Sequence, residues 1–207
     1  MSNSALTLAL PKGRVLEEAV ELFGKAGIDL SPVVAKTRRL TFDLKDLRVL
    51  VVRDADVPTY VEWGAADVGI AGRDVLEEQG RDLYEPLDLG IGRCRLCIAE
   101  PADARLNGER QLRYATKFPH LTRRHLEARG EVADVIKLSG SVELGPLTGL
   151  SDRIVDLVSS GETLRQHHLR EVETLLEVTA RLVVNRASWK VRRPAIDGLL
   201  SRLRSVV

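Results

Sequence analysis

The chain has 207 residues, 44% of which are hydrophobic, and its 31 basic and 30 acidic side chains give a formal net charge of +1. This length is enough for one large domain or two small lobes. The balanced charge argues against a general nucleic-acid-binding or membrane-surface protein, although local basic clusters that bind small anions are compatible with it. The N-terminus has no basic start and Pro11 interrupts its apolar run, so we expect no signal peptide. No stretch approaches about 20 apolar residues, so we also expect no membrane span and a soluble, cytoplasmic chain.

Short apolar runs and amphipathic segments alternate along the first half of the chain. Runs typical of strands lie at residues 6–10, 40–44, 49–52 and 67–71, and the middle two predict a hairpin. Hydrophobic positions with helical spacing extend over residues 15–26, and Gly27 ends that helix. Asp56 and Pro58 predict the capped start of a second helix, and a third begins after Gly72.

The same alternation continues through the second half. Extended segments are predicted at residues 83–100, 113–117, 135–138 and 171–185. A helix is predicted at residues 120–129. Apolar positions with helical spacing at 189–207 predict a C-terminal helix that packs back on the first lobe, with a partner-binding surface as the alternative. Strands separated by helices imply an α/β fold rich in parallel strand pairs.

Two cysteines, Cys94 and Cys97, lie three residues apart on a predicted strand. Half a zinc site and a redox pair are the functional interpretations of this pattern. However, residues three apart on a strand point to opposite faces, and the chain has no second cysteine pair and no histidines with zinc-ligand spacing. We therefore expect buried, reduced strand cysteines.

A pattern of Gly-x-x-Asp, an apolar strand, a Gly and a helix occurs twice, starting at Gly64 and at Gly149. Two such units predict two similar lobes, with a coincidence of common α/β turn chemistry as the alternative. Lobes joined by long extended segments predict an α/β fold with a central cleft, of the periplasmic-binding-protein (type II) architecture, in which ligands lie in the cleft. We place the first lobe at residues 1–90 with 178–207, and the second at 91–177.

The most informative stretch covers residues 143–164. An apolar run that contains Asp156 ends in two serines and Gly161, and then opens a helix. This arrangement is typical of an anion cradle, because Gly161 allows close backbone approach and the first N–H groups of the helix, with its dipole behind them, point at the ligand. Hydroxyl donors are added by Ser159, Ser160 and Thr163. The carboxylate of Asp156 disfavours a phosphate, so we expect it to face sugar hydroxyls or a metal, and the stretch predicts a phosphorylated sugar as ligand.

The same stretch resembles the signature of the ATP phosphoribosyltransferase family, which opens histidine biosynthesis. In that family a Glu is followed after five residues by Gly, then by a small residue, an Ile-x-Asp-Leu run and Ser/Thr-Gly-x-Thr-Leu. The positions that fit in register are Glu143, Gly149, Ser151, Ile154, Asp156, Leu157, Ser160, Gly161, Thr163 and Leu164. A bare Ser-Ser-Gly triplet is usually an ordinary turn, whereas this whole series of matches is specific.

The resemblance extends over nearly the whole chain. It includes the Lys12-Gly13-Arg14 turn, Arg38-Arg39-Leu40, the Arg53-x-x-Asp56-x-Pro58 turn, residues 64–76 and 88–96, and the segment from Tyr114 through Thr116 and Lys117 to Leu121. It implies a reaction in which N1 of the adenine of ATP attacks C1 of the ribose of phosphoribosyl pyrophosphate and pyrophosphate leaves, with Mg²⁺ accompanying the phosphates. Because the N1 lone pair is free at neutral pH, this chemistry needs cations at the pyrophosphate and acids near the ribose rather than a strong base.

The resemblance also implies site residues in both lobes. The implied ligands of phosphoribosyl pyrophosphate are Glu143, Asp152, Asp156, Ser159, Ser160, Gly161, Glu162, Thr163 and Leu164. The implied ATP ligands are Lys12, Gly13, Arg14, Arg38 and, more weakly, Arg73, and the catalytic cations are Arg53, Arg38 and Lys12. No metal ligand is assigned, although Asp156 is a candidate through ribose-bound Mg²⁺.

Each basic residue also has a simpler interpretation. In the simpler interpretation, Lys12 and Arg14 are solvated charges in a turn. Of Arg38 and Arg39, we expect one to be a strand-edge charge that blocks pairing, and we favour Arg38 as the functional residue. Arg53 then pairs with one of the two aspartates that follow it.

The chain stops soon after the predicted lobes, so it resembles the short form of the family. This resemblance implies a homodimer that works with a regulatory subunit resembling histidyl-tRNA synthetase, and no nucleic-acid or membrane partner. Two other classes compete with it: a solute-binding protein of the same architecture, and a phosphoribosyltransferase acting on another base. The missing signal peptide and the sugar-phosphate signature argue against the first, and the basic residues of the first lobe favour a triphosphate over a free base.

Overall fold

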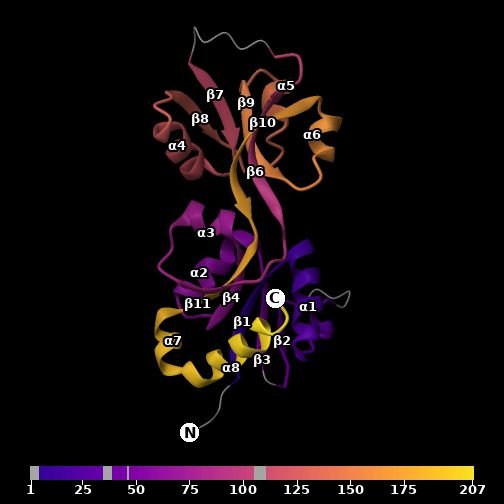
Figure 1. Ribbon diagram of the computed structural model, residues 1–207, viewed down its shortest axis with the longest axis vertical. Helices are drawn as coiled ribbons and strands as arrows, with labels where there is room; N and C mark the ends of the chain where they lie inside the picture. The colour runs from indigo at the N-terminus through magenta and orange to yellow at the C-terminus, as the bar shows by residue number, and fades with distance from the viewer. Residues whose placement is uncertain (1–4, 35–38, 46, 105–110) are drawn as a thin grey trace. The chain divides into compact units, whose positions relative to one another are not determined.

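The computed structural model describes residues 5–34, 39–45, 47–104 and 111–207 (Figure 1). The chain divides into two compact units: unit 1 consists of Met1–Gly92 and Thr179–Val207, and unit 2 of Arg93–Val178. Each unit has its own β-sheet and its own buried clusters of apolar side chains. In the described part of the chain, no helix has the length and apolar character that crossing a membrane requires.

Unit 1 is built on a six-stranded sheet with the order β2-β3-β1-β4-β11-β5. Its strands are β1 (Leu6–Pro11), β2 (Thr41–Asp43), β3 (Leu47–Val52), β4 (Val68–Gly72), β5 (Tyr84–Asp88) and β11 (Ala180–Val184). β1 pairs in parallel with both β3 and β4, whereas β2 pairs antiparallel with β3, so the predicted hairpin is confirmed. Because β3, β1 and β4 are parallel neighbours, their carboxyl ends meet at one edge of the sheet.

Helices pack on this sheet with their apolar faces. They are α1 (Arg14–Lys25), α2 (Val57–Glu62), α3 (Arg73–Gln79), α7 (Arg186–Val191) and α8 (Arg193–Arg204), with 3₁₀ turns η1 (Ser31–Val33) and η2 (Asp54–Asp56). Pro58 lies in the first turn of α2 as predicted, but the side chain of Asp56 makes no capping hydrogen bond, because this residue already ends η2.

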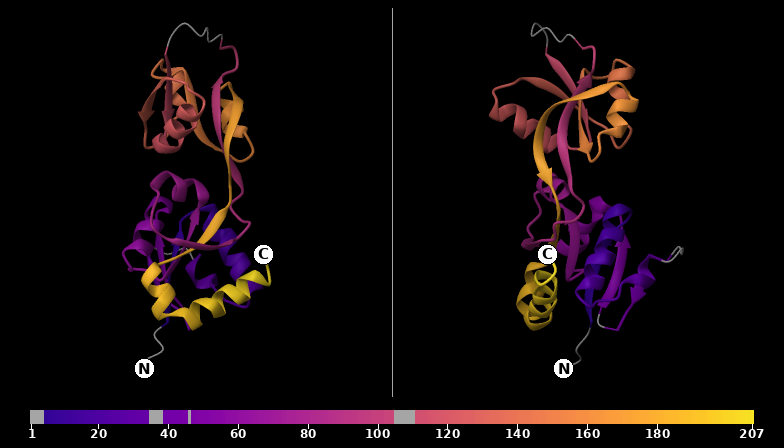
Figure 2. Two further views of the ribbon diagram at one scale, coloured as in Figure 1. Left: turned by 60° about the vertical axis from the view of Figure 1, so that its left-hand side comes forward. Right: turned by 45° about the vertical axis from the view of Figure 1, so that its right-hand side comes forward.

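The C-terminal segment packs on unit 1, as predicted (Figure 2). Four side chains of α8 join the main core of the unit: Ile196, Leu199, Leu200 and Leu203. The segment forms two helices instead of the single one expected, with the break at Arg192. Pro194, in the first turn of α8, explains the break, because proline has no N–H to continue a helix from the preceding turn.

Unit 2 is built on a five-stranded sheet with the order β10-β6-β9-β7-β8. Its strands are β6 (Cys94–Pro101), β7 (Leu112–Thr116), β8 (Ala133–Lys137), β9 (Arg153–Val158) and β10 (Leu169–Val178), and its helices are α4 (Pro119–Ala128), α5 (Leu144–Leu147) and α6 (Glu162–Gln166). β7 is parallel to β8 and β9, whereas β6 is antiparallel to β9 and β10. Both sheets are therefore mixed, with three parallel neighbours to which antiparallel strands are added.

Apart from β2, the antiparallel strands come from the two long segments that were predicted as continuous. Residues 83–100 form β5 in unit 1 and β6 in unit 2, and residues 171–185 belong to β10 and β11. Gly90 and Gly92 separate β5 from β6, and both have positive φ angles, 65° and 66°. This left-handed backbone ends the first strand and is readily adopted only by glycine.

Both cysteines lie on β6 as free thiols. Cys97 is fully buried, and its Sγ lies 3.5 Å from Thr174 Oγ1 and 3.5 Å from Glu171 Oε2. Burial raises the pKa of the Cys97 thiol. Such a thiol stays protonated and unreactive at neutral pH.

Candidate functional site

A pocket of about 200 Å³ lies in unit 2 where β9 ends and α6 begins. Of the nine residues predicted to bind phosphoribosyl pyrophosphate, its lining contains Glu143, Asp156, Ser159, Ser160, Gly161, Glu162, Thr163 and Leu164. Ile154, Leu157 and Val158 of β9 complete the lining. The structure therefore brings one continuous stretch, with Glu143 from the start of α5, around a single concave site.

The turn between β9 and α6 depends on Gly161. This residue has φ 74° and ψ 5°, in the left-handed region that only glycine enters without strain. Ser160 Oγ accepts a hydrogen bond from the Glu162 N–H at 3.3 Å, and Arg165 pairs with Glu162 at 2.7 Å. These contacts fix the loop, in which Ser159, Ser160 and Thr163 are exposed.

α6 has only five residues, Glu162–Gln166. The field of a helix dipole is therefore smaller here than the sequence argument assumed, because few peptide units are aligned. The anion-binding capacity of the pocket rests mainly on the loop hydroxyls and on the backbone that Gly161 exposes.

Asp156 is one of three acids in the pocket lining, with Glu143 and Glu162. It is half-buried on β9, and burial raises the pKa of its carboxyl. Hydrogen bonding to the Leu157 backbone and the charge of Lys117 lower that pKa, whereas the charge of Glu143 raises it. Two acids and one lysine thus share an electrostatic neighbourhood beside the loop.

Lys117 was not predicted as a site residue. It directly follows β7, and the parallel pairing of β7 with β9 sets Thr116 opposite Val155. One step further along both strands, Lys117 and Asp156 are neighbours. The signal that would have identified it was the strand register, which a single sequence does not contain.

Asp152 is the one of the nine predicted residues that is not part of the lining of this pocket. Its side chain is buried with 7% exposure, and Oδ2 accepts the backbone N–H of Arg113 at 2.9 Å. The guanidinium of Arg113 lies 3.4 Å from the same carboxylate. These bonds tie the start of β9 to β7.

The predicted cations of unit 1 lie at the edge of the sheet where three parallel strands end. Lys12, Gly13 and Arg14 follow β1, Arg53 follows β3, and Arg73 follows β4. The Lys12 N–H donates to the Val52 carbonyl at 3.1 Å, which ties the first two turns together. Gly13, with φ 84° and ψ −150°, begins α1 in a conformation that favours glycine.

These cations differ in their surroundings. Arg14 pairs with Glu18 at 3.4 Å and Arg73 with Glu77 at 2.7 Å, each within its own helix. Arg53 is exposed, and none of the ion pairs between described residues involves it, so the interpretation as a local salt bridge is not supported. Arg38 lies outside the described residues, and Arg39 is exposed.

A buried acid lies at the same edge of unit 1 and was also missed. Asp74, in the first turn of α3, is 5% exposed. Burial raises the pKa of its carboxyl to about 6, opposed by hydrogen bonds from the backbone N–H groups of Asp74 and Val75, and the charge of Asp54 raises it further. Perturbed acids of this kind concentrate at functional sites.

Comparison with known proteins decides the family. The profile of the family described as "ATP phosphoribosyltransferase" matches residues 53–205. The chain belongs to this family. A relative from Geobacter sulfurreducens, "ATP phosphoribosyltransferase 2", is 52% identical over 204 residues and the match covers 96% of each chain. A relative from Acidithiobacillus ferrooxidans, "ATP phosphoribosyltransferase", is 53% identical over 213 residues, with 99% of each chain covered.

Solved structures agree with the family and with the predicted fold class. The "ATP phosphoribosyl transferase (HisG:HisZ) complex" from Thermotoga maritima matches with a TM-score of 0.84 and 36% identity, over 97% of this chain and 98% of that one. The alkanesulfonate-binding protein SsuA from Xanthomonas axonopodis matches with a TM-score of 0.58 over 98% of this chain and 72% of that one. At 15% identity the second likeness shows the fold alone, which is the periplasmic-binding-protein-like α/β fold.

Membership of the ATP phosphoribosyltransferase family shows the activity. The chain is an enzyme, a phosphoribosyltransferase that catalyses the first step of histidine biosynthesis. Which residues bind each substrate is a separate question, and the geometry of the two units bears on it.

Proposed function

We propose that the pocket at the end of β9 binds phosphoribosyl pyrophosphate and that the basic edge of unit 1 binds ATP. The observation that carries this proposal is the lining of the 200 Å³ pocket, where loop hydroxyls and a glycine turn lie beside the acids Asp156 and Glu143. Hydroxyls and exposed backbone N–H groups donate hydrogen bonds to a phosphate, and carboxylates accept hydrogen bonds from the hydroxyls of a sugar.

Within the pocket, the loop holds the phosphate attached to the ribose. Gly161 gives the backbone its close approach, and Ser159, Ser160 and Thr163 donate from their hydroxyls. Asp156 accepts hydrogen bonds from the ribose hydroxyls. Because positive charge develops on the ribose as pyrophosphate leaves, ionised acids near the ring stabilise the transition state more than the ground state.

Lys117 keeps Asp156 in its ionised form. Burial and Glu143 both favour the protonated acid, and the charge of Lys117 opposes them. We therefore assign Lys117 as a positioning residue that acts through Asp156.

In unit 1, the cations at the carboxyl ends of β1 and β3 act on phosphates. Arg53 and Lys12 stabilise the negative charge that develops on the leaving pyrophosphate, and the turn of Gly13 and Arg14 binds the phosphates of ATP. Arg73 contributes less, because Glu77 already binds its guanidinium at 2.7 Å. The adenine N1 lone pair needs no base, which agrees with a site whose groups are cations and carboxylates.

Mg²⁺ fits this donor set as a companion of the substrate phosphates. It prefers oxygen ligands and usually combines one or two carboxylates with phosphates and water. The carboxylates of the pocket lining are Asp156, Glu143 and Glu162, of which Glu162 pairs with Arg165, and no group of three or more potential metal ligands occurs among the described residues. When bound, the ion neutralises charge on the pyrophosphate.

For assembly we propose a homodimer that works with a regulatory subunit resembling histidyl-tRNA synthetase, in the cytoplasm. The Thermotoga maritima relative, 36% identical, was solved as a HisG:HisZ complex. Without its partner the chain should keep its activity unchanged across a histidine titration. Saturable inhibition of the isolated chain by submillimolar histidine would overturn this form of regulation.

The proposed substrates are tested by mixing the chain with ATP, phosphoribosyl pyrophosphate and Mg²⁺ and recording the near-ultraviolet spectrum. Attack by N1 changes the adenine absorbance and releases one pyrophosphate per product, and Asp156→Asn should lose both signals. Turnover of a free base in place of ATP would contradict the assignment of the basic edge of unit 1 to a triphosphate.

A further inference from the structure

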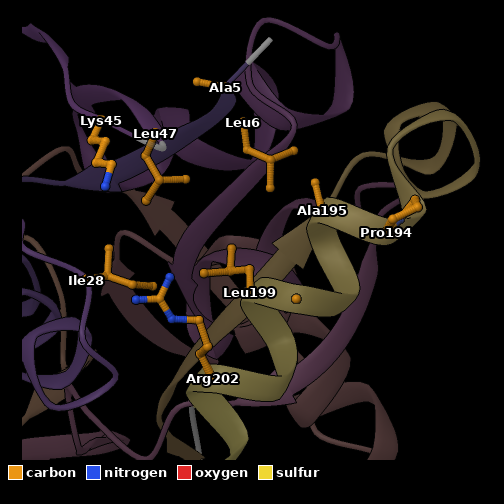
Figure 3. A pocket seen from close by; sticks show the side chains of 10 residues that line it. Ala5, Leu6, Ile28, Lys45, Leu47, Pro194, Ala195, Leu199 and Arg202 are labelled. Carbon is orange, nitrogen blue, oxygen red and sulfur yellow. The ribbon is translucent and has the colours of Figure 1, made fainter. Parts of the chain in front are cut away.

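A second and larger cavity, of about 320 Å³, lies in unit 1 at the opposite end of the sheet from the proposed ATP ligands (Figure 3). Leu6 and Leu47, the first residues of β1 and β3, lie on one side of it, and α8 contributes Leu199. Ile28, beyond the end of α1, completes an apolar floor. Cavities that hold small molecules begin at about 300 Å³, so this one is large enough for a ligand.

This cavity is separate from the proposed substrate sites. β1 and β3 each have six residues, and a strand rises about 3.3 Å per residue, so about 20 Å of strand lies between Leu6 and Lys12. Lys12 and Arg53 follow the carboxyl ends of the strands that begin at the cavity. The proposed chemistry in unit 1 therefore has no use for this space.

The charged side chains of the lining are both cations, Lys45 and Arg202. Figure 3 shows their nitrogen ends on the side of the cavity where Ile28 lies. Arg202 is held in place, because its Nε donates to the Ala26 carbonyl at 3.0 Å and its Nη2 donates to Gly27. Its Nη1 has no hydrogen-bond partner among the described residues. A rigid guanidinium and a lysine above an apolar floor fit a ligand with one negative end and an apolar body.

Gly198 supplies an independent observation. It lines the cavity from the middle of α8 (Arg193–Arg204), where glycine is a poor helix former. A Cβ at this position would meet no atom within 4 Å, so packing does not require a glycine here. Gly198 is exposed and belongs to the cavity lining, so a long side chain at this position would extend over the open side of the cavity.

We propose that this cavity is a binding site for a small organic anion with an aliphatic body, of the class of medium-chain monocarboxylates. The carboxylate lies against Lys45 and Arg202, and the chain lies on Leu6, Leu47 and Leu199. Two cations, with no acid among the described residues of the lining, select the charge, and the apolar side chains of the wall select the aliphatic body.

The test uses the full-length enzyme with methyl-labelled leucine and isoleucine, titrated with octanoate and followed by NMR. Four lining residues carry the labelled methyl groups: Leu6, Ile28, Leu47 and Leu199. Saturable shifts centred on these methyls are expected. 1-Octanol, which has the same chain without the charge, and inorganic phosphate, which has the charge without the chain, should each bind at least tenfold more weakly.

Variants fix the location of the site. Gly198→Leu should weaken octanoate binding at least tenfold by filling the cavity, and Lys45→Gln should weaken it several-fold. Gly24→Leu is the matched control, since Gly24 lies inside a helix, a Cβ added there would also meet no atom within 4 Å, and the residue is outside the lining. Its affinity for octanoate should be unchanged.

Three results would overturn the proposal. The first is octanoate binding that survives Gly198→Leu, which would place the ligand elsewhere. The second is equal affinity for octanol and octanoate, which would remove the role of the cations. The third is the absence of saturable shifts at the four labelled residues. If Gly198→Leu unfolds the chain, Gly198→Ala gives the same comparison, because alanine favours the helix while narrowing the cavity.

Discussion

Asp152 and Arg113 are joined by two reciprocal hydrogen bonds: the Arg113 N–H donates to the side-chain Oδ2 of Asp152 at 2.9 Å, and the Asp152 N–H donates to the Arg113 carbonyl at 2.8 Å. Unit 1 contains the same arrangement. There the Thr7 N–H donates to Asp67 Oδ2 at 2.8 Å, and the Asp67 N–H donates to the Thr7 carbonyl at 2.9 Å. In each unit an aspartate that precedes a strand thus anchors it to the start of its parallel neighbour.

This pair of contacts gives the internal sequence repeat a structural basis. Gly64 and Gly149, three residues before the two aspartates, have φ angles of 73° and 71°. Each repeat is therefore a left-handed glycine turn, an anchoring aspartate and a strand, β4 or β9, that pairs in parallel with its neighbour. The interpretation of the repeat as two similar units, rather than a coincidence of turn chemistry, is the one that the structure supports.

Asp152→Ala should lower stability rather than substrate affinity. The substitution leaves the Arg113 N–H and guanidinium without their carboxylate, and hydrogen bonds to a charged group contribute about 1.5–3 kcal/mol. We expect a loss of about 2 kcal/mol in the free energy of unfolding, measured by urea denaturation. Affinity of the folded protein for phosphoribosyl pyrophosphate should stay within threefold of wild type, and a large loss of affinity without a loss of stability would restore Asp152 to the substrate site.

Lys117→Met should shift the acid limb of the pH–rate profile to higher pH. The lysine charge lowers the pKa of Asp156, so its removal raises that pKa and the carboxylate becomes protonated at a higher pH than in wild type. The profile of kcat/KM measures this shift, and Lys117→Arg should restore it. Lys137→Met, an exposed lysine at the end of the neighbouring strand β8, is the control and should leave the profile unchanged.

Asp74→Asn should stabilise the protein at pH 7.5 but not at pH 4. A carboxyl pKa of about 6 in the folded chain, against 3.8 when unfolded, means that the folded state binds its proton more tightly. Stability is therefore lost as pH rises from about 4 through 6, by at most about 3 kcal/mol for this group. The asparagine amide does not ionise, so the variant does not lose this stability as the pH rises. The melting temperature of the Asp74→Asn protein should therefore exceed that of wild type by several degrees at pH 7.5.

Asp197, which is only half-buried, provides the comparison for Asp74. It pairs with Arg193 at 2.7 Å on the surface of α8, and Asp197→Asn should give no gain at pH 7.5. An Asp74→Asn protein whose advantage over wild type is the same at pH 4 and pH 7.5 would show that Asp74 does not titrate as described.

Arg53→Ala should reduce turnover more than substrate affinity. Removal of one preorganised charge from a site of developing negative charge costs about 100- to 1,000-fold in rate. Steady-state kinetics should show this loss in kcat, with KM values within a few-fold of wild type. Arg48→Ala removes an exposed arginine of the adjoining strand β3 that pairs with Asp43, and should have no such effect. Turnover of Arg53→Ala within threefold of wild type would show that Arg53 has no part in the chemistry.

The parts of the fold that local pattern determines were predictable from the sequence. The strand of residues 6–10, the helix that follows it and the hairpin of residues 40–52 each have their own apolar period and their own turn signals. The division of the segment 83–100 into two strands was not predictable from the sequence, because both halves of the segment are apolar. Only long-range pairing decides that β5 joins one sheet and β6 the other. The break in the C-terminal helix was missed because the apolar positions continue in register past Pro194.

The same distinction applies to the candidate site. The pocket loop from Asp156 to Leu164 is contiguous in sequence, so its chemistry was visible in one stretch. Lys117 and Asp74 acquire their significance from other elements: the first from the register of β7 with β9, the second from burial at the end of β4. Asp152 is adjacent in sequence to the pocket loop, but its carboxylate bonds to Arg113 on β7, a contact that the sequence alone does not reveal.

The central claim, that the loop between β9 and α6 is the phosphoribosyl pyrophosphate site, is tested most directly by calorimetric titration of that substrate. Gly161→Val and Thr163→Ala should each weaken binding at least tenfold, which is about 1.4 kcal/mol. Gly130→Val is the matched control, because Gly130 has a φ of 69° in the same unit and carries the same backbone strain outside the pocket. The account predicts wild-type affinity for the control and weakened binding for the two loop variants; wild-type affinity in both loop variants would contradict it.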